Sequence, residues 1–370
     1  MRPERLRILH TESSTGWGGQ EIRILTEARG MLERGHRVML LTPRTATLYE
    51  AAGRRSIPVE PMPMEKKRPA SLAAMARWLR AHRRDYDVIN THSSTDSWLT
   101  ALAAAWLRDT PPIVRTRHVS TPIGRNGPTR WLYTRASARI VTTGEALRKQ
   151  LARENGFDPA RITSVRTGID LTRFRPMDPA ACRRDLGIEP RPTLGIVATL
   201  RDWKGHDYLL DAWRELQRRF PQWQLLIIGD GPQRARLEAR VAAEGLAASV
   251  RFVGNQDDVP AWLNSLDLFA LPSFGDEGVP QGIMQAMACG LAVVSTPVGA
   301  IEEAVQRDRT GLIVPPRDAA ALAQALAALM ADAGLRRRMG AAGLAYAQAH
   351  FGVDEMLDKM EAVFRSVIRG

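Results

Sequence analysis

Two short apolar runs, at residues 268–271 and 292–295, enclose the polar residues of this chain that are best placed to bind an extended, anionic ligand. Each run is short enough to be a buried strand. Between them, Glu277 lies in a loop before an expected helix of about three turns, and Gln285 follows it by roughly two turns, or about 11 Å. The two side chains therefore cannot act on one atom, but each could hold one end of a ligand. Backbone N–H groups at the helix start would attract a phosphate.

A pair of cations follows another expected strand, at residues 194–198. Arg201 and Lys204 lie in the loop that leads into an expected helix at 206–220. Arginine offers a bidentate fork and lysine a compact point charge, so the pair suits a diphosphate. The alternative is a pair of solvated surface charges, which is the usual state of neighbouring Arg and Lys residues.

Two glycines near the N-terminus lie where a loop joins a strand to a helix. Gly18 and Gly19 fall between an expected strand at 6–10 and an expected helix at 20–34. In such a loop the backbone N–H groups can face a phosphate, but the spacing differs from the dinucleotide-binding fingerprint, so a dehydrogenase is a weak interpretation. The glycines could equally serve a tight turn.

Histidines follow two other expected strands. His118 comes directly after the strand at 113–116, and His92 follows the strand at 88–90. In isolation, each would be interpreted as an ordinary hydrogen-bonded histidine. The sequence offers no third ligand near them at metal-binding spacing, so no metal site is predicted.

The elements that position these residues alternate between strands and helices along the whole chain. The alternation predicts parallel sheets covered on both faces, which bind ligands at the carboxyl ends of their strands. A charged, proline-containing segment at 167–192 interrupts it and marks a domain boundary. Strands are expected at 6–10, 38–42, 59–62, 88–90, 113–116, 140–142 and 162–165, and then at 194–198, 225–228, 250–253, 268–271, 292–295 and 310–314. Besides the helix after Glu277, helices are expected at 20–34, near 48, and at 71–83, 97–106, 129–135, 145–154, 206–220, 233–244, 319–330, 335–349 and 353–368.

Taken together, the polar positions resemble the signature of family 4 glycosyltransferases. The signature begins at Glu277. Seven residues and then a polar residue follow it, and after these come Ala-Met-Ala-Cys-Gly and an apolar strand. Arg201 and Lys204 match the family's Arg-x-x-Lys. Gly18-Gly19-Gln-Glu matches its glycine loop, and His118 matches a histidine after the corresponding strand. The family has glutamate at both ends of its signature, whereas this chain has Gln285 at the second end. An amide can still donate to and accept from a ribose diol.

The resemblance implies the GT-B fold, an α/β architecture of two Rossmann-like, doubly wound parallel-sheet domains facing across a cleft. Residues 1–175 would form the acceptor-side domain, onto which the last helix at 353–370 would pack back, and residues 176–352 would form the donor-binding domain. The resemblance also implies sugar transfer from a nucleotide-diphosphate donor, with retention at the anomeric carbon. The acceptor would be a glycan or a lipid-linked glycan of the bacterial envelope, such as a growing lipopolysaccharide.

The same resemblance implies roles for individual residues. Arg201 and Lys204 would neutralise the departing diphosphate without a metal ion or other cofactor, and Glu277 would hold hydroxyls of the donor sugar. His118 would orient that sugar, and Gln285 would hold the ribose. The implied catalytic residues are Arg201, Lys204, Glu277 and His118, and the implied donor-binding residues are Gly18, Gly19, Asn255, Gly278, Val279, Pro280, Gln281 and Gln285.

The composition is that of a globular protein with an excess of positive charge. The 370 residues include 52 Lys and Arg against 40 Asp and Glu, a formal net charge of +12. The excess could form a solvated, Arg-rich surface, or it could meet an anionic membrane, substrate or nucleic acid. Its densest group lies between Lys66 and Arg84 and includes Trp78, which favours a peripheral contact with an anionic inner leaflet.

Two other functions fit parts of the sequence. A nucleotide-sugar epimerase on the same fold would need carboxylates for proton or water chemistry, and Glu277 alone stands out. A nucleic-acid-binding protein would need a contiguous basic face with interleaved aromatics, whereas only 6% of residues are aromatic and the arginines are dispersed. The sequence has no apolar run of transmembrane length and no apolar leader, so the expected location is the cytoplasm. Cys182 and Cys289 are expected to be unreactive thiols there.

Overall fold

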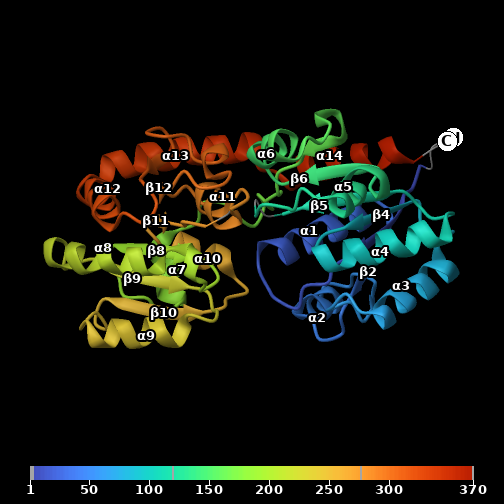
Figure 1. Ribbon diagram of the computed structural model, residues 1–370. Coiled ribbons are helices and arrows are strands. Elements are labelled where there is room, and N and C mark those ends of the chain that lie inside the picture. Colours follow the sequence, from blue (N-terminus) through green and yellow to red (C-terminus); the bar gives the residue numbers. More distant parts are fainter. Residues whose placement is uncertain (1–3, 119–120, 276, 369–370) are drawn as a thin grey trace. The chain divides into compact units, whose positions relative to one another are not determined.

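The protein is described by a computed structural model, which covers residues 4–118, 121–275 and 277–368 (Figure 1). The chain forms two compact units. Unit 1 consists of Met1–Gly168 and Val353–Gly370, and unit 2 consists of Ile169–Gly352.

Unit 1 is built on a seven-stranded parallel sheet with the strand order β3-β2-β1-β4-β5-β6-β7. The order reverses between β1 and β4, and open parallel sheets bind ligands at the carboxyl ends of the strands at such a switch point. The strands are β1 (Arg7–Thr11), β2 (Arg37–Thr42), β3 (Val59–Pro61), β4 (Val88–Thr91), β5 (Ile113–Arg117), β6 (Arg139–Thr142) and β7 (Ile162–Ser164).

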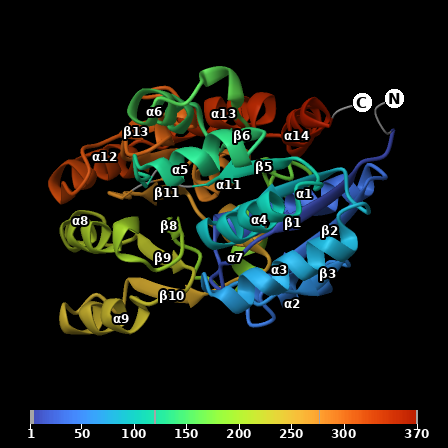
Figure 2. The ribbon, with the colours of Figure 1, turned by 45° about the vertical axis from the view of Figure 1, so that its right-hand side comes forward.

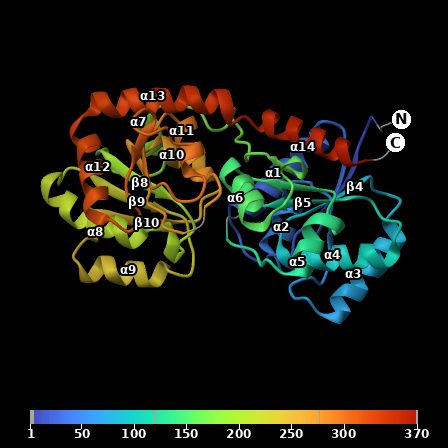
Figure 3. The same ribbon diagram turned by 45° about the horizontal axis from the view of Figure 1, so that its top comes forward.

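The helices of unit 1 cover this sheet. Met356, Met360 and Phe364 of the last helix share one buried core with strand and helix residues from the start of the chain, and this helix packs on the first one (Figure 3). The helices are α1 (Gly19–Glu33), α2 (Thr47–Arg54), α3 (Pro69–His82), α4 (Ser94–Leu107), α5 (Gly127–Trp131), the π-helical η1 (Leu132–Ala136), α6 (Glu145–Asn155), the 3-10 turn η2 (Pro159–Arg161) and α14 (Val353–Val367).

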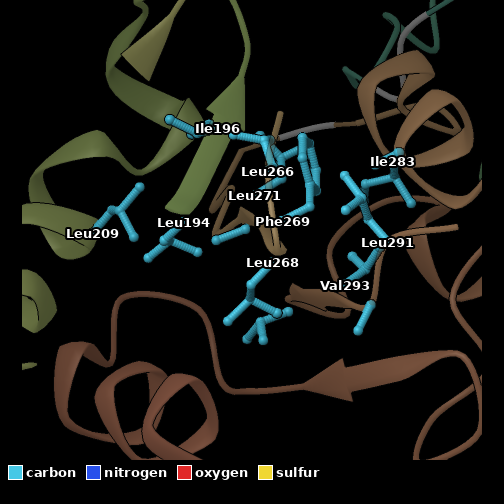
Figure 4. Packing of buried hydrophobic residues seen from close by; sticks show 14 of the residues in the cluster. Leu194, Ile196, Leu209, Leu266, Leu268, Phe269, Leu271, Ile283, Leu291 and Val293 are labelled. Atoms are coloured by element: carbon cyan, nitrogen blue, oxygen red, sulfur yellow. The ribbon is translucent and has the colours of Figure 1, made fainter. Parts of the chain in front are cut away.

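Unit 2 contains a six-stranded parallel sheet with the order β10-β9-β8-β11-β12-β13. Its switch point lies between β8 and β11, whose apolar side chains form the centre of the unit 2 core (Figure 4). The strands are β8 (Thr193–Val197), β9 (Gln224–Ile228), β10 (Val250–Gly254), β11 (Leu268–Leu271), β12 (Val293–Ser295) and β13 (Gly311–Ile313). The helices are α7 (Pro179–Asp185), η3 (Asp202–Lys204), α8 (His206–Arg219), α9 (Arg234–Ala243), α10 (Val259–Asn264), α11 (Gln281–Ala288), η4 (Ile301–Glu303), α12 (Ala319–Ala331) and α13 (Ala333–His350).

The two parallel sheets, with helices alternating with strands, confirm the predicted fold class. The predictions miss two helices that begin with proline in their first turn, α7 and α10. In α7, Asp178 caps the helix and Pro179 occupies the first position, where a missing N–H costs nothing. The predicted helix after Glu277 is also too long, because α11 has 8 residues and begins only after Pro280. No helix in the described part of the chain has both the length and the apolar character needed to span a bilayer.

Candidate functional site

The residues predicted to bind a diphosphate gather at the switch point of the unit 2 sheet. There β8 and β11 are hydrogen-bonded neighbours, although β9 and β10 lie between them in the sequence. The loop after β8 carries Arg201 and Lys204, and the loop after β11 carries Glu277. Because both loops leave the carboxyl ends of adjacent strands, the fold brings them together.

Lys204 and Glu277 form a shielded ion pair at this switch point. Lys204 Nζ donates to Glu277 Oε1 at 2.6 Å, and the Ser273 hydroxyl donates to the same oxygen at 2.8 Å. The lysine side chain is 19% exposed and the glutamate side chain 8%. A short, charge-assisted bond with so little access to water fixes the ammonium group in one place.

Two glycines allow the backbone to pass close to this ion pair. Gly205 has a φ of +79°, and a Cβ there would lie 2.0 Å from the Pro272 carbonyl oxygen. Gly299 has a φ of +60°, and a Cβ there would lie 2.0 Å from the Glu277 carbonyl oxygen. Both the left-handed backbone and the contact distance therefore require glycine at these positions.

The first turn of α11 lies against the end of β8. A Cβ on Gly282 would lie 2.8 Å from the Val197 carbonyl oxygen, which shows how closely the helix approaches the strand. Pro280 is the N-cap residue, and its ring has no group that could bond the N–H groups of the first turn. The positive end of the α11 dipole thus begins directly after the loop that carries Glu277.

The remaining predicted donor-binding residues of unit 2 lie on α11 or at strand ends. Gln285 is 9% exposed on α11. Val279 and Pro280 are buried, and Gly278 and Gln281 are half-buried. Asn255 is exposed directly after β10. The apolar side chains of Val279, Ile283, Met284 and Met287 are all buried, as their helical spacing predicts.

Arg201 differs from Lys204 in being exposed. Its guanidinium lies 5.2 Å from the centre of the Trp203 ring, a cation–π contact. The Phe274 N–H donates to the Trp203 carbonyl oxygen at 2.8 Å, which joins the loop after β8 to the loop after β11. Within the described residues Arg201 makes no ion pair, so its charge is available to an anionic ligand.

In unit 1, His118 is part of a buried row of three histidines. His118 Nε2 lies 3.0 Å from His92 Nδ1, and His92 Nε2 lies 2.9 Å from His10 Nδ1. His118 is 9% exposed, His92 2% and His10 0%. The histidines that follow β4 and β5 therefore lie in contact. His10 is not among the predicted site residues, because it lies inside β1 and the sequence pattern predicts only a strand position for it.

The glycine loop precedes α1 in unit 1. Gly18 is the N-cap residue of α1, with a φ of −179°, and Gly19 is exposed as the first residue of the helix. A φ near 180° suits any residue, and a Cβ on Gly18 would meet Glu21 Oε2 at 3.7 Å, an ordinary contact. Neither backbone conformation nor packing therefore requires glycine at position 18.

Glu12, directly after β1, is a buried carboxyl that is not among the predicted site residues. It accepts a bond from the Ser14 N–H at 2.6 Å and another from the Gln20 side-chain amide. Burial, together with the nearby Asp96 carboxylate, raises the pKa of Glu12 to about 8. Glu12 thus holds the loop that leads to Gly18.

Asp96 ties β1 to the start of α4. Its carboxylate accepts the Thr11 hydroxyl at 2.9 Å and the Ser13 hydroxyl at 3.2 Å, and it forms a capping box with Ser93. The sequence signal for this role was the Ser-x-x-Asp spacing at the start of the helix. Asp96 therefore organises the carboxyl edge of the unit 1 sheet.

The described residues contain no group of three His, Cys, Asp or Glu side chains that could hold a metal ion. The three histidines bond one another in a row and do not face a common point.

Two family models match this chain, one in each half. Residues 17–173 match the model described as Glycosyltransferase Family 4. Residues 191–332 match the model described as Glycosyl transferases group 1. The matched segments contain Gly18, His118, Arg201 and Glu277.

Curated relatives extend the similarity over nearly the whole chain. The D-inositol 3-phosphate glycosyltransferase of Nocardia farcinica is 31% identical, over 94% of this chain and 86% of the relative. The lipopolysaccharide core biosynthesis mannosyltransferase LpsB of Rhizobium meliloti is 34% identical, over 72% of this chain and 77% of the relative.

The fold matches a solved structure of a protein bound to a nucleotide-sugar. The structure of HepE from Anabaena in complex with UDP-glucose has a TM-score of 0.86 at 22% identity, over 98% of this chain and 100% of that chain. The two sheets have the architecture of GT-B glycosyltransferases. By its own sequence, this chain belongs to family 4 of the glycosyltransferases. The epimerase interpretation finds no support among these matches.

Proposed function

We propose that this glycosyltransferase takes its sugar from a nucleoside-diphosphate donor, whose diphosphate is bound in unit 2 by Arg201, Lys204 and the first turn of α11. The observation that carries the proposal is the Lys204–Glu277 ion pair at the switch point between β8 and β11. A fixed ammonium group, an exposed guanidinium and the start of a helix all favour a negative charge at one place.

In the transfer step, the bond between the anomeric carbon and the diphosphate oxygen breaks. Negative charge then builds on the departing diphosphate and positive charge on the sugar. Cations that are already in position stabilise that transition state without reorganising, and removing one such donor from an enzyme costs on the order of 10²–10³ in turnover. Lys204 meets this condition because Glu277 already holds its ammonium group.

The other predicted residues take the roles that their positions support. Glu277 binds hydroxyls of the donor sugar, and the backbone from Gly278 to Gln281 caps the phosphate or the sugar. Gln285 binds the ribose. Asn255 lies at the end of β10, where the backbone would meet the base. In unit 1, Gly18 and Gly19 face the donor phosphates or the acceptor, and His118 orients the transferred sugar.

We further propose that transfer retains the configuration at the anomeric carbon and needs no metal ion. The donor phosphate itself would take the proton of the acceptor hydroxyl. Full activity in excess EDTA, together with a product whose anomeric configuration by NMR equals that of the donor, is the expected result. Strict dependence on added Mg²⁺, or an inverted product, would contradict this scheme.

The acceptor is proposed to be a glycan or lipid-linked glycan of the cell envelope. The name of one of these relatives, a lipopolysaccharide core biosynthesis mannosyltransferase, supports this class of acceptor.

The surface of α3 and α4 supports a peripheral position at an anionic inner leaflet. These helices pack side by side (Figure 2). Arg77, Arg80 and Arg84 are exposed on and just after α3. Trp106 and Leu102 of α4 are 74% and 42% exposed. Cations and apolar side chains on neighbouring helices suit the headgroup region of such a bilayer.

Sedimentation with anionic liposomes tests this contact. Each cation contributes about 1 kcal/mol, so replacing Arg77, Arg80 and Arg84 with glutamine should weaken binding by roughly 100-fold. The matched control replaces Arg214, Arg218 and Arg219, which are exposed on α8, and should leave binding unchanged. Equal loss in both triple variants would mean that net charge alone drives binding.

A thermal-shift screen against UDP-, GDP- and ADP-sugars tests the donor proposal. A ligand at 100 times its Kd stabilises the folded protein by about 2.7 kcal/mol, so one class of donor should raise the Tm of the wild type clearly. The shift should shrink in the Lys204→Ala variant. If none of these nucleotides changes the Tm, or if Lys204→Ala responds like the wild type, the proposal is wrong.

A further inference from the structure

The row of histidines in unit 1 has a fixed geometry that the proposed reaction does not by itself explain. The His10 and His92 rings are stacked, with centroids 5.2 Å apart, and the His92 and His118 rings have the same centroid separation. Each neighbouring pair of rings shares one N···N hydrogen bond. Each of these bonds needs one proton, carried by one of its two nitrogens.

All three rings are neutral at neutral pH. Burial lowers the pKa of His10 to about 3 and lowers the pKa values of His92 and His118 well below the usual range. The Arg23 and Arg115 guanidinium groups lower the pKa values of His92 and His118 further. Three neutral rings carry three N–H protons, of which two lie in the shared bonds and one is at an end of the row.

Two arrangements of these protons satisfy both shared bonds. In the first, His118 Nε2 donates to His92, His92 Nε2 donates to His10, and the third proton lies on His10 Nε2. In the second, His10 Nδ1 donates to His92, His92 Nδ1 donates to His118, and the third proton lies on His118 Nδ1. The arrangements differ in which end of the row carries the free N–H group.

The surroundings of the two ends select the second arrangement. His10 Nε2 is buried and has no hydrogen-bond partner among the described residues. The Phe364 ring packs edge to face against the His10 ring, with the ring centroids 6.4 Å apart. A buried N–H without a partner is costlier and rarer than a buried acceptor without one, so His10 Nε2 carries no proton. The bias corresponds to on the order of a tenfold excess of one arrangement over the other.

We propose that His10 and His92 are positioning residues that hold His118 as its Nδ1–H tautomer, so that His118 presents a hydrogen-bond donor and not a base to the substrate. The His118 backbone is fixed as well, because the Thr143 hydroxyl donates to its carbonyl oxygen at 3.2 Å. Within the described residues His118 Nδ1 has no partner, and His118 keeps 9% exposure. The inference rests on the proposed function in taking the substrate as the partner of this N–H.

Nitrogen NMR of the ligand-free, full-length protein with ¹⁵N-labelled histidine tests the tautomer without any substrate. At pH 7, the His118 signals should show a protonated Nδ1 and an unprotonated Nε2. The His118→Asn variant assigns these signals by their loss. A protonated His118 Nε2, or an imidazolium, would overturn the proposal. The experiment also separates this inference from the proposed function, because a protein that binds no nucleotide-sugar still gives this spectrum.

The His92→Phe variant tests whether the row selects the tautomer. It keeps an aromatic ring in the stack but removes the N–H that donates to His118, so the His118 signals should move toward those of a tautomer mixture. The matched control is His36→Phe, because His36 is also buried in unit 1 but its ring has its contacts outside the row, with the Leu6 N–H at 3.1 Å and Glu361 Oε2 at 3.4 Å. Unchanged His118 signals in His92→Phe, or equal changes in the control, would overturn the assignment.

Activity gives a second readout once a donor is known. The asparagine amide can place an N–H near the position of Nδ1, whereas the glutamine amide places it near Nε2. We therefore expect His118→Asn to retain on the order of tenfold more kcat/KM than His118→Gln, the value of one hydrogen bond. Equal activity in the two variants, or more in His118→Gln, would overturn the donor role of Nδ1.

Discussion

Variants of Lys204 can separate two contributions of this residue: the contribution of its ion pair with Glu277 to folding stability, and the contribution of its charge to turnover. Lys204→Met keeps most of the side-chain volume but removes the cation from a carboxylate that is only 8% exposed. Breaking a fully buried pair costs about 3–5 kcal/mol, and water reaches part of this lysine, which is 19% exposed. We therefore expect the free energy of unfolding to fall by about 2 kcal/mol, which corresponds to a fall in Tm of roughly 4–8 °C for a unit of this size.

The double variant Lys204→Met/Glu277→Gln removes both charges and leaves neither unpaired. Its loss of unfolding free energy should be about 1–2 kcal/mol smaller than the sum of the losses in the two single variants, because the two residues are in direct contact. Turnover should behave differently. Lys204→Met should lower kcat by about 10²–10³, and the double variant should not regain it, because the departing diphosphate still lacks its cation.

Thermal unfolding and steady-state kinetics on the four proteins measure these quantities in parallel. The wild type, the two single variants and the double variant form a complete cycle. A loss of less than tenfold in kcat for Lys204→Met would remove this lysine from the mechanism. Strictly additive stability changes would show that the 2.6 Å contact contributes nothing to folding.

Three further predictions address the rest of the site. Gln285→Ala should raise the donor KM about tenfold with little change in kcat, because ribose binding stabilises ground and transition states equally; a collapse of kcat at constant KM would contradict this role. Gly18→Ala should leave the Tm unchanged while lowering kcat/KM, because only a ligand needs the space; a fall in Tm as large as that of Gly299→Ala would mean the glycine is structural. Between pH 7 and pH 5, the free energy of unfolding of the wild type, measured with urea, should fall by about 2 kcal/mol more than that of the His206→Gln variant. Burial lowers the His206 pKa to about 4, so the unfolded chain takes up the proton first as the pH falls and stability is lost below about pH 6.5. Parallel pH profiles of the two proteins would contradict this assignment.

Much of the fold could be predicted because the strands are short apolar runs separated by amphipathic helices. The errors have local causes. Helix α7 lies in the proline-containing segment at 167–192, whose composition predicts a domain boundary, and helix α10 has only 6 residues, too few to show an apolar periodicity. The helix after Glu277 is predicted too long because Val279 continues the apolar spacing of the helix, while Pro280 prevents the helix from including it.

The sequence predicts individual candidate residues for the site but not the contacts among them. Lys204 and Glu277 lie far apart in the sequence, and their contact depends on β8 and β11 being neighbours, which the order of strands along the chain does not reveal. His10 could not be found because a polar residue inside a short strand gives no periodic signal. Glu12 and Asp96 had a usable signal, since both lie near the ends of strands at the switch point of unit 1.

The central claim is that unit 2 binds the diphosphate of the donor between its Arg/Lys pair and the start of α11. A crystal structure with a bound nucleoside diphosphate tests it most directly. We predict phosphate oxygens about 2.7–2.9 Å from Lys204 Nζ and from the Arg201 guanidinium, with the first-turn N–H groups of α11 facing the same phosphates. A nucleotide bound elsewhere in the protein, with these groups in contact with solvent alone, would contradict the account.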